Sequence, residues 1–109
     1  MTHQPIENTI NSLLWFEDPG HGWLRVPLAH LDALNIKEKI TPFSYKDGGY
    51  AYLEEDLDAY VYLKTLQDAG YTVPDIPTVH KSVRHLPHYV NPAYVTNRHG
   101  PTEWNPLGA

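Results

Sequence analysis

Two apolar runs near the start of the chain lie on either side of a turn. Residues 12–16 and residues 23–26 are rich in leucine, tryptophan and valine, a composition compatible with β-strands. The sequence Asp-Pro-Gly at residues 18–20 favours a turn, because these residue types impose or tolerate turn conformations. The pattern predicts two short strands joined by a connection longer than a two-residue loop, with His21 exposed at its tip.

Apolar residues at helical spacing predict a short helix directly after the second run. Leu28, Leu31 and Leu34 recur at every third position. Pro27 precedes them and suits the start of a helix, because its φ angle is already fixed near the helical value. Asn35 follows them and suits the left-handed conformation that often ends a helix.

A second pair of apolar and aromatic runs predicts a hairpin. Residues 40–45 and 50–53 flank the sequence Asp-Gly-Gly at residues 47–49, a strong local signal for a tight turn between two strands. Pro42 lacks a backbone N–H group, so the first strand of this hairpin is expected at the edge of a sheet.

The clearest helix comes next and ends before Gly70, which provides a C-terminal cap. Leu57 and Val61 belong to a broad apolar stripe, so the helix is amphipathic. Glu55 or Asp56 is expected to cap its N-terminus, because a carboxylate there accepts free backbone N–H groups and faces the positive end of the helix dipole.

The rest of the chain has a different composition. Residues 71–109 contain six of the ten prolines but remain rich in valine, tyrosine and leucine. We expect an extended arm that packs on a compact domain of residues 1–70, or on a neighbouring subunit. Residues 1–11 are polar and are expected to fray. The prediction is an α+β fold with a small antiparallel sheet of about four strands, two helices and a long proline-rich C-terminal arm.

Composition restricts the function classes without identifying one. Apolar residues make up 41% and charged residues 19% of the chain, as in ordinary globular proteins. The chain has no cysteine, which excludes disulfides and thiolate chemistry, and no apolar run reaches the ~20 residues of a membrane span. We therefore expect a cytoplasmic protein with no membrane partner.

Charge is unevenly distributed along the chain. Residues 1–70 contain five Lys or Arg against eleven Asp or Glu, whereas residues 71–109 contain three against two. The formal net charge is −5, and the sequence has none of the clustered Lys and Arg that a generic nucleic-acid binder needs. Nucleic acid is therefore not an expected partner.

His21 is the first candidate for chemistry. Glycines flank it on both sides, and Glu17 and Asp18 are close enough in the sequence to orient its imidazole for general acid–base catalysis. The alternative is a turn residue that only bonds to the backbone, and no nucleophile motif accompanies this histidine.

Four acids follow the apolar run that ends at Leu53. They are Glu54, Glu55, Asp56 and Asp58. The group could hold a hard cation or raise the pKa of one member, but it lacks the glycine-spaced pattern of a calcium loop. A charged helix start is the simpler explanation, and pairing with Lys81, Arg84 or His85 of the arm is the interpretation we prefer.

Three histidines of the arm have a spacing that invites a zinc interpretation. They are His80, His85 and His88. Pro87 lies inside the last interval, and no cysteine or fixed carboxylate completes a ligand set. The sequence therefore predicts no metal and no cofactor.

Aromatic residues complete the predicted surface. Tyr45, Tyr50 and Tyr52 flank the hairpin turn and could stack on a base or ring, although cross-strand packing is the commoner role. The expected binding residues are Asp18, His21, Trp23, Tyr45, Tyr50, Tyr52, Glu55 and Arg84. The expected catalytic residues, if the protein is an enzyme, are His21, Glu54, Glu55 and Asp56.

Three stretches carry a resemblance to known proteins. They are P-G-H-G-W-L-x-V-P at residues 19–27, F-S-Y at 43–45 and Y-L-E-E-D-L-D at 52–58. The pattern resembles a family of small proteins of unassigned activity from bacteriophage genomes, plasmids and bacterial chromosomes. That family often has a cysteine where this chain has Leu57, so a thiol role is excluded here. The resemblance implies an accessory or host-directed protein of a mobile genetic element, for example one used in host takeover.

Two function classes follow. The favoured class is a non-catalytic binding protein of a bacteriophage or plasmid, with a host or phage protein as its partner. A small-molecule ligand and self-association through the arm are alternatives within this class. The second class is a small hydrolase or transferase that uses His21 with acids at the start of the second helix. The lack of a nucleophile motif, phosphate loop or metal set favours the binding protein.

Overall fold

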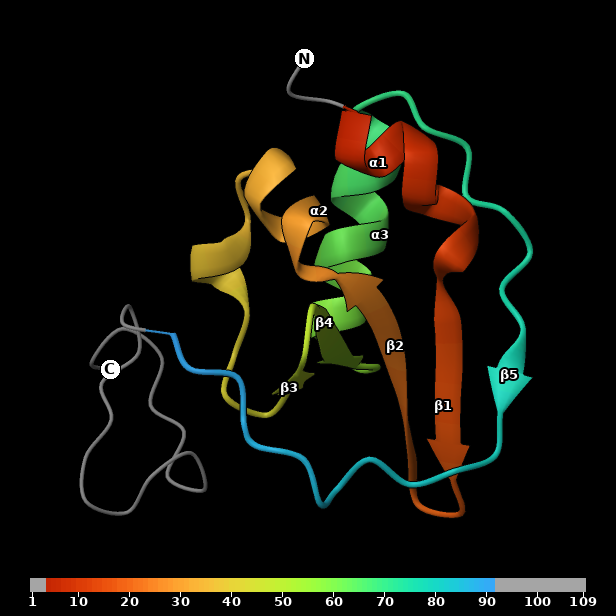
Figure 1. The fold of residues 1–109 in the computed structure, drawn as a ribbon, viewed down its shortest axis with the longest axis vertical. Coiled ribbons are helices and arrows are strands. Elements are labelled where there is room, and N and C mark those ends of the chain that lie inside the picture. Colours follow the sequence, from red (N-terminus) through yellow and green to blue (C-terminus); the bar gives the residue numbers. More distant parts are fainter. Residues whose placement is uncertain (1–3, 92–109) are drawn as a thin grey trace.

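The structure, a computed structural model, describes residues 4–91. It is an α+β fold with one five-stranded sheet in the order β3-β4-β2-β1-β5 (Figure 1). The strands are β1 (Leu14–Asp18), β2 (His21–Pro27), β3 (Tyr45–Asp47), β4 (Tyr50–Glu54) and β5 (Thr78–Val79). The helices are α1 (Gln4–Thr9), α2 (Leu28–Ala33) and α3 (Asp58–Asp68), with 3₁₀ turns η1 (Ile10–Ser12) and η2 (Lys37–Lys39). None of the helices in this part of the chain has the length and apolar character needed to cross a membrane.

The predicted fold class is confirmed, but the sheet is mixed and has five strands rather than four. β5 pairs in parallel with β1, and the two arrows point the same way in Figure 1. The backbone N–H of Trp15 donates to the carbonyl oxygen of Pro77, at 2.9 Å. A two-residue strand that pairs only with a distant partner has no local sequence signal, which explains why it was not predicted.

The first hairpin is tighter than expected. Asp18 pairs with His21 in the β1–β2 register, so only Pro19 and Gly20 form the loop. The Asp18 carboxylate accepts bonds from the backbone N–H groups of Gly20 and His21, at 2.9 and 3.0 Å. This side-chain turn lets both strands continue to the loop. The expectation of a longer connection is therefore wrong, and His21 is the first residue of β2.

The second hairpin and two helix ends follow the sequence signals. Asp47 pairs with Tyr50 around the glycine turn, where Gly48 has a φ of 60°. Asn35 after α2 and Gly70 after α3 also have positive φ, at 60° and 97°. β3 is an edge strand as predicted, but it begins only at Tyr45, after the proline.

A buried histidine connects the three helices. His30 of α2 is fully buried, with its Nδ1 2.8 Å from the Tyr62 hydroxyl of α3 and its Nε2 2.6 Å from the Thr9 hydroxyl of α1. Ile6 of α1 is also buried in the core. These contacts hold α1 in place, so the expectation that residues 4–11 would fray is wrong.

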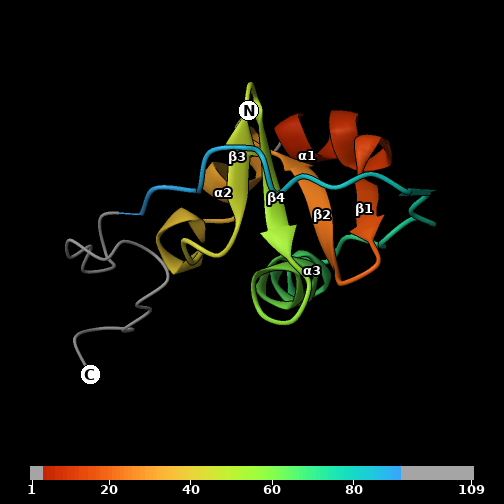
Figure 2. The ribbon, with the colours of Figure 1, turned by 90° about the horizontal axis from the view of Figure 1, so that it is seen from below.

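The sheet has two differently covered faces. Leu24 and Val26 of β2 point to the face covered by the helices, which we call the helix side, whereas Trp23 and Arg25 point to the other. We call residues 71–91 the arm, and the face crossed by residues 80–91 the arm side. Figure 2 shows α3 and this part of the arm on opposite sides of the sheet. The remaining residues of the predicted arm, 92–109, lie outside the described part.

The two cores differ in composition. The helix-side core is mainly aliphatic, with Ile6, Leu13, Leu24, Val26, Leu31, Ile36, Ile40, Ala51, Leu53, Ala59, Tyr62, Leu66 and Tyr89 as its buried members. The arm-side core is mainly aromatic, with Trp23, Tyr45, Tyr52 and Val83 buried and Phe16, Tyr50 and Leu86 packed against them.

Candidate functional site

The candidate site is a groove of ≈ 460 Å³ on the arm side. It is lined by His21, Trp23, Phe43, Tyr45, Glu54, Leu57, Arg84 and His88. The strands β2, β3 and β4 supply four of these residues, and the arm supplies two. Segments far apart in the sequence therefore converge on one concave surface.

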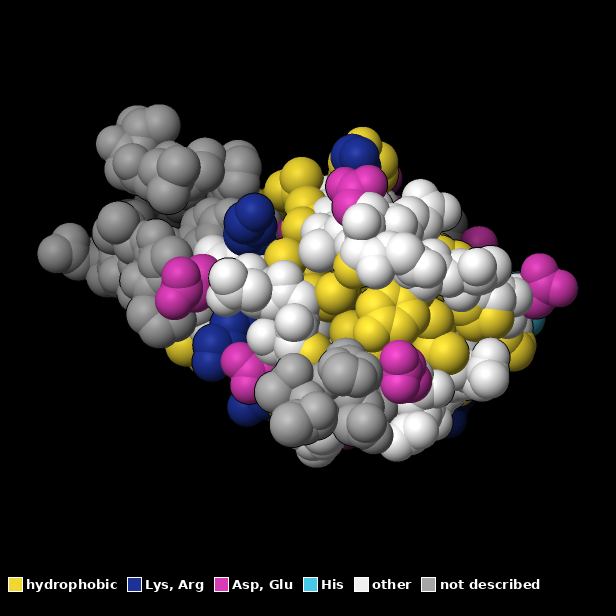
Figure 3. Space-filling view, turned by 90° about the horizontal axis from the view of Figure 1, so that it is seen from above, with side chains coloured by type: hydrophobic (Ala, Val, Ile, Leu, Met, Phe, Trp, Pro, Cys, Tyr) yellow, Lys and Arg dark blue, Asp and Glu magenta, His cyan; other side chains and the backbone are white. Residues whose placement is uncertain are grey.

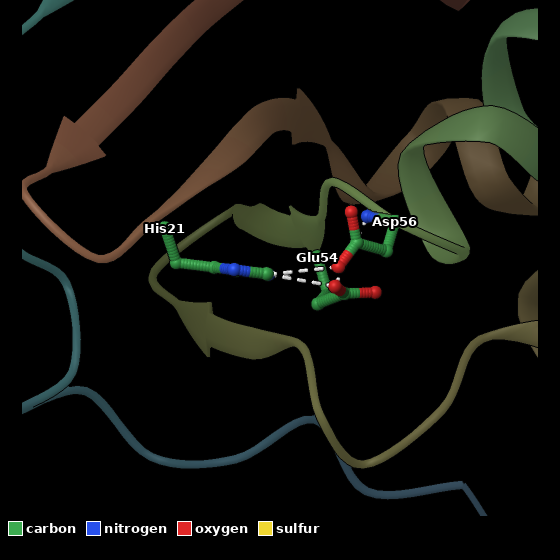
Figure 4. Close-up of side chains that lie close together, drawn as sticks. All are labelled: His21, Glu54 and Asp56. Atoms are coloured by element: carbon green, nitrogen blue, oxygen red, sulfur yellow. Dashed lines mark hydrogen bonds and ion pairs between the residues drawn. The ribbon is translucent and has the colours of Figure 1, made fainter.

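His21 and Glu54 form a close polar pair in this groove. The antiparallel register pairs Trp23 with Glu54, which brings the start of β2 beside the end of β4. The Nε2 of His21 lies 2.7 Å from a carboxylate oxygen of Glu54 and 3.9 Å from one of Asp56 (Figure 4). The turn and the acidic segment after β4 thus meet at one end of the sheet.

Glu54 also holds the turn that leads into α3. Its two carboxylate oxygens accept bonds from the backbone N–H groups of Asp56 and Leu57, each at 3.0 Å. Leu57 occupies the cap position of α3 and makes no capping bond with its side chain. The expectation that Glu55 or Asp56 caps this helix is therefore wrong, because the cap position falls at Leu57 and the Glu54 carboxylate holds only the turn before it.

Trp23 forms the aromatic floor of the groove. Its side chain is buried, and its ring lies 5.3 Å from the His21 ring in an edge-on arrangement and 5.9 Å from the Tyr45 ring. The Arg84 guanidinium of the arm lies 4.9 Å from the centre of the Trp23 ring, a cation–π contact. The arm is thus in direct contact with the floor.

Arg84 pairs with the turn rather than with the acids after β4. Its Nε donates to the Asp18 carboxylate at 2.9 Å, which joins the arm to the β1–β2 loop. The hydrogen bond from Arg84 holds the pKa of Asp18 well below its usual range. The preferred pairing of Arg84 with the acids at residues 54–58 is therefore wrong, because Arg84 forms its ion pair with Asp18 instead.

The three tyrosines have separate environments. Tyr45 and Tyr52 are buried, and only Tyr45 lines the groove. Tyr52 packs edge-on against Phe16, with 5.4 Å between the ring centres, and the Arg25 guanidinium lies 4.2 Å from the centre of the Tyr50 ring. Packing within the molecule thus occupies Tyr50 and Tyr52.

Glu55 lies outside the groove. Its backbone N–H donates to the Gly22 carbonyl oxygen at 3.1 Å. Its carboxylate occupies the space beside Gly22, where a Cβ atom would be only 2.6 Å from an oxygen of Glu55. Gly22 therefore makes room for this acid, and the two residues line a separate hollow near Trp15.

Sequence reasoning did not find Phe43, Leu57 and His88 as lining residues. Phe43 and Leu57 are 39% and 41% exposed, which is unusually accessible for large apolar side chains. We call these two residues the apolar rim of the groove. The His88 ring lies 4.9 Å from the Tyr45 ring, and its Nδ1 donates to the Pro42 carbonyl oxygen at 2.7 Å. No local pattern marks these residues, because only the long-range fold places them together.

A buried acid supports the groove from behind. Asp58 is fully buried, and one of its oxygens accepts bonds from the Thr41 N–H, the Thr41 hydroxyl and the Ser44 hydroxyl. Burial raises the pKa of Asp58 to about 6, although these hydrogen bonds oppose the rise. The Ser44 hydroxyl in turn accepts the backbone N–H of Glu54 at 2.9 Å. Asp58 thus positions the strand end that carries Glu54.

Metal-ligating groups meet at one place in the described residues. His21, Glu54 and Asp56 each offer one ligand atom, and these atoms lie within 4.8 Å of one another. His80 instead lies 3.7 Å from Glu17, and His88 bonds to Pro42. His80 and His88 of the arm therefore have separate partners within the chain.

The surface around α1 differs from the groove. Seen from above in Figure 3, hydrophobic side chains lie among uncharged groups, and acidic and basic side chains are scattered around them. This face shows no single-sign charge of the kind that attracts nucleic acid. It therefore adds no second candidate to the groove.

Comparisons of the chain with protein-family models, curated proteins and solved structures give no match.

Proposed function

We propose that this is a non-catalytic binding protein and that the groove on the arm side receives part of a partner protein. The supporting observation is where the three stretches of the family resemblance lie in the fold. Residues 19–27, 43–45 and 52–58 supply six of the eight lining residues: His21, Trp23, Phe43, Tyr45, Glu54 and Leu57. Stretches that carry a common pattern thus converge on one surface.

The lining is suited to binding a protein segment. Phe43 and Leu57 offer exposed apolar contact area, and Trp23 provides a rigid floor. Aromatic and apolar residues with a few polar groups are typical of binding clefts. The eight lining residues include no serine, threonine, cysteine or lysine that could act as a nucleophile.

We further propose that the partner is a host or phage protein, because the resemblance implies a mobile genetic element. A small molecule is the alternative ligand of the same groove, and self-association through the arm is the alternative mode. The cytoplasm of the bacterial host is the compartment that this proposal requires.

The test uses matched variants as baits. Wild-type protein, Leu57→Ser and Val90→Ser are immobilised and exposed to host lysate, and bound proteins and small molecules are identified by mass spectrometry. Leu57→Ser removes an apolar side chain of the rim, and serine is a good residue at a helix cap. Val90 is 79% exposed outside the groove, so Val90→Ser is the control.

The expected result is a partner that wild type and Val90→Ser retain and Leu57→Ser loses. The partner is then purified and its affinity for the three proteins measured. Equal affinity of all three would contradict a role for the groove.

One observation favours the enzyme alternative. The 2.7 Å bond between His21 and Glu54 orients an imidazole at a concave surface, as general acid–base catalysis requires. Because the lining has no serine, threonine, cysteine or lysine, such an enzyme would use His21 to activate water or a group of its substrate. A screen of hydrolase and transferase substrates tests this, and turnover by wild type that His21→Gln lacks would favour the enzyme over the binding protein.

A further inference from the structure

We infer that His21, Glu54 and Asp56 form a binding site for a divalent transition metal of the Zn²⁺ type at one end of the groove. The inference goes beyond partner binding, and it differs from the expectation drawn from the sequence that the chain holds no metal. His21 at the start of β2 lies 33 positions before Glu54 and 35 before Asp56, so no local spacing links the histidine to the two acids.

The donor atoms match the chemistry of such an ion. An imidazole nitrogen and carboxylate oxygens are common zinc ligands, with bonds of about 2.0–2.2 Å. Two carboxylates and a neutral imidazole supply a charge of −2, which balances the ion. Arg84, the groove residue with a fixed positive charge, is paired with Asp18 and does not neutralise these acids.

The geometry is close to that of a bound state. Tetrahedral ligands at about 2.1 Å from an ion are separated from one another by about 3.4 Å. His21 Nε2 lies 2.7 Å from Glu54 and 3.9 Å from Asp56, so each separation differs from this value by less than about 1 Å. Asp56 has a side chain that is 74% exposed, so it can move toward the ion at little cost.

Two of the ligands are already oriented by neighbours. Both oxygens of Glu54 accept backbone N–H groups, which fixes the direction of its carboxylate. The ring of His21 packs in a T-shaped arrangement against the ring of Trp23, and its Nε2 lies toward Glu54, where the ion would replace the proton of the hydrogen bond. Such supporting contacts are usual around protein metal sites, because they reduce the cost of ordering the ligands.

The site would remain open on one side. Three protein ligands leave a fourth tetrahedral position for water or for a group of a bound molecule. His21 and Glu54 both line the groove, so this position faces the proposed partner surface. Figure 4 shows the three side chains directed toward a common point.

The experiment measures metal binding by the isolated full-length protein without a histidine tag. Wild type, His21→Gln and Asp56→Asn are titrated with Zn²⁺ in a calorimeter, and Co²⁺ absorption reports the coordination geometry. Asp32→Asn and His80→Gln are the matched controls, because both residues are exposed and lie outside the site. No partner protein is needed, so the result is independent of the proposed function.

We expect one Zn²⁺ per wild-type chain, a tetrahedral Co²⁺ spectrum, and unchanged affinity in both controls. Asp56→Asn should weaken binding at least about tenfold, and His21→Gln should remove it. Because Asp56 is exposed, its substitution leaves the fold intact and decides the question even if His21→Gln is unstable. No binding to wild type, or equal affinity of wild type and Asp56→Asn, would overturn the inference.

Discussion

The two faces of the sheet are built differently. The helix side buries mainly aliphatic side chains under three helices, and its one buried histidine is bonded at both ring nitrogens. The arm side buries a few aromatic rings under an extended segment, with Arg25 and Arg84 lying over tyrosine and tryptophan rings. The same strands supply both faces, because neighbouring residues point in opposite directions.

We propose that this contrast separates stability from recognition. Helices pack on one face, whereas a single extended segment crosses the other and leaves part of it accessible as the groove. The polar pair, the apolar rim and the proposed metal ligands all lie at the groove or beside it.

Removing the arm should have the largest effect. A chain that ends at Gly70 loses Val83 and Leu86, which cover the arm-side core, and also Tyr89, which is buried in the helix-side core. Each fully buried apolar side chain contributes roughly 1.5–3 kcal/mol, so a marked fall in melting temperature and solubility is expected. A chain that ends at Asn91 separates the effect of residues 71–91 from that of residues 92–109. An unchanged thermal melt after truncation at Gly70 would show that the arm does not stabilise the fold.

Trp23→Ala should lower the free energy of unfolding by about 3–5 kcal/mol, because it removes the largest buried side chain of the arm side. Leu24→Ala, at the next position of β2, is the helix-side counterpart, with an expected loss of about 2–5 kcal/mol. Urea denaturation followed by circular dichroism measures both. A Trp23→Ala loss below about 1 kcal/mol would mean that the arm-side core adds little stability.

Asp58→Asn should change how stability depends on pH. The pKa of Asp58 is raised from 3.8 to about 6 in the folded protein, so between about pH 4 and pH 6 the folded state binds more protons than the unfolded state. The stability of the wild type should therefore fall as pH rises through this window, by roughly 3 kcal/mol from this group. Asparagine keeps an oxygen for Thr41 and Ser44 but does not titrate.

Urea denaturation of the wild type and of Asp58→Asn, measured from pH 4 to pH 7, gives the difference in stability between the two proteins at each pH. Asp58→Asn should gain stability relative to wild type as pH rises to 6 and then remain level. A constant difference across the range would contradict the raised pKa of Asp58.

His21→Ala should have the smallest effect on stability and a clear effect on binding. The side chain is 26% exposed and makes one bond to Glu54, so the expected loss is about 1 kcal/mol or less. Binding of the partner from the bait experiment should weaken, whereas His80→Ala should not change it. A stability loss as large as that of Trp23→Ala would show that His21 is part of the architecture rather than of a site.

Local signals in the sequence predicted the local parts of the fold. The Asp-Gly-Gly turn, the left-handed Asn35 and the cap at Gly70 each depend on residues within a few positions, and all three are confirmed. The α+β class followed from the same signals. The predicted numbers of strands and helices were each one too low, because β5 and α1 are held by partners far away in the sequence.

The candidate site was only partly predictable for the same reason. The sequence indicated His21 by the glycines on both sides of it and Glu54 by the run of acids that follows Leu53. It also named Trp23 among the expected binding residues. It did not reveal that Arg84 bonds to Asp18, or that Glu54 holds the turn before α3, because these contacts depend on the sheet register and on the path of the arm. Phe43 and His88 reach the groove through irregular segments, which have no periodic pattern.

The parallel pairing of β5 with β1 has a consequence for how the chain folds during synthesis. Trp15 pairs with Thr78, and the residues that cover the aromatic core follow still later. Contacts of such high sequence separation form slowly, since a long loop must close first. On the ribosome, the first hairpin therefore emerges long before its edge partner, and its aromatic face stays uncovered in the nascent chain. The order of synthesis makes this face available to other molecules before the fold is complete.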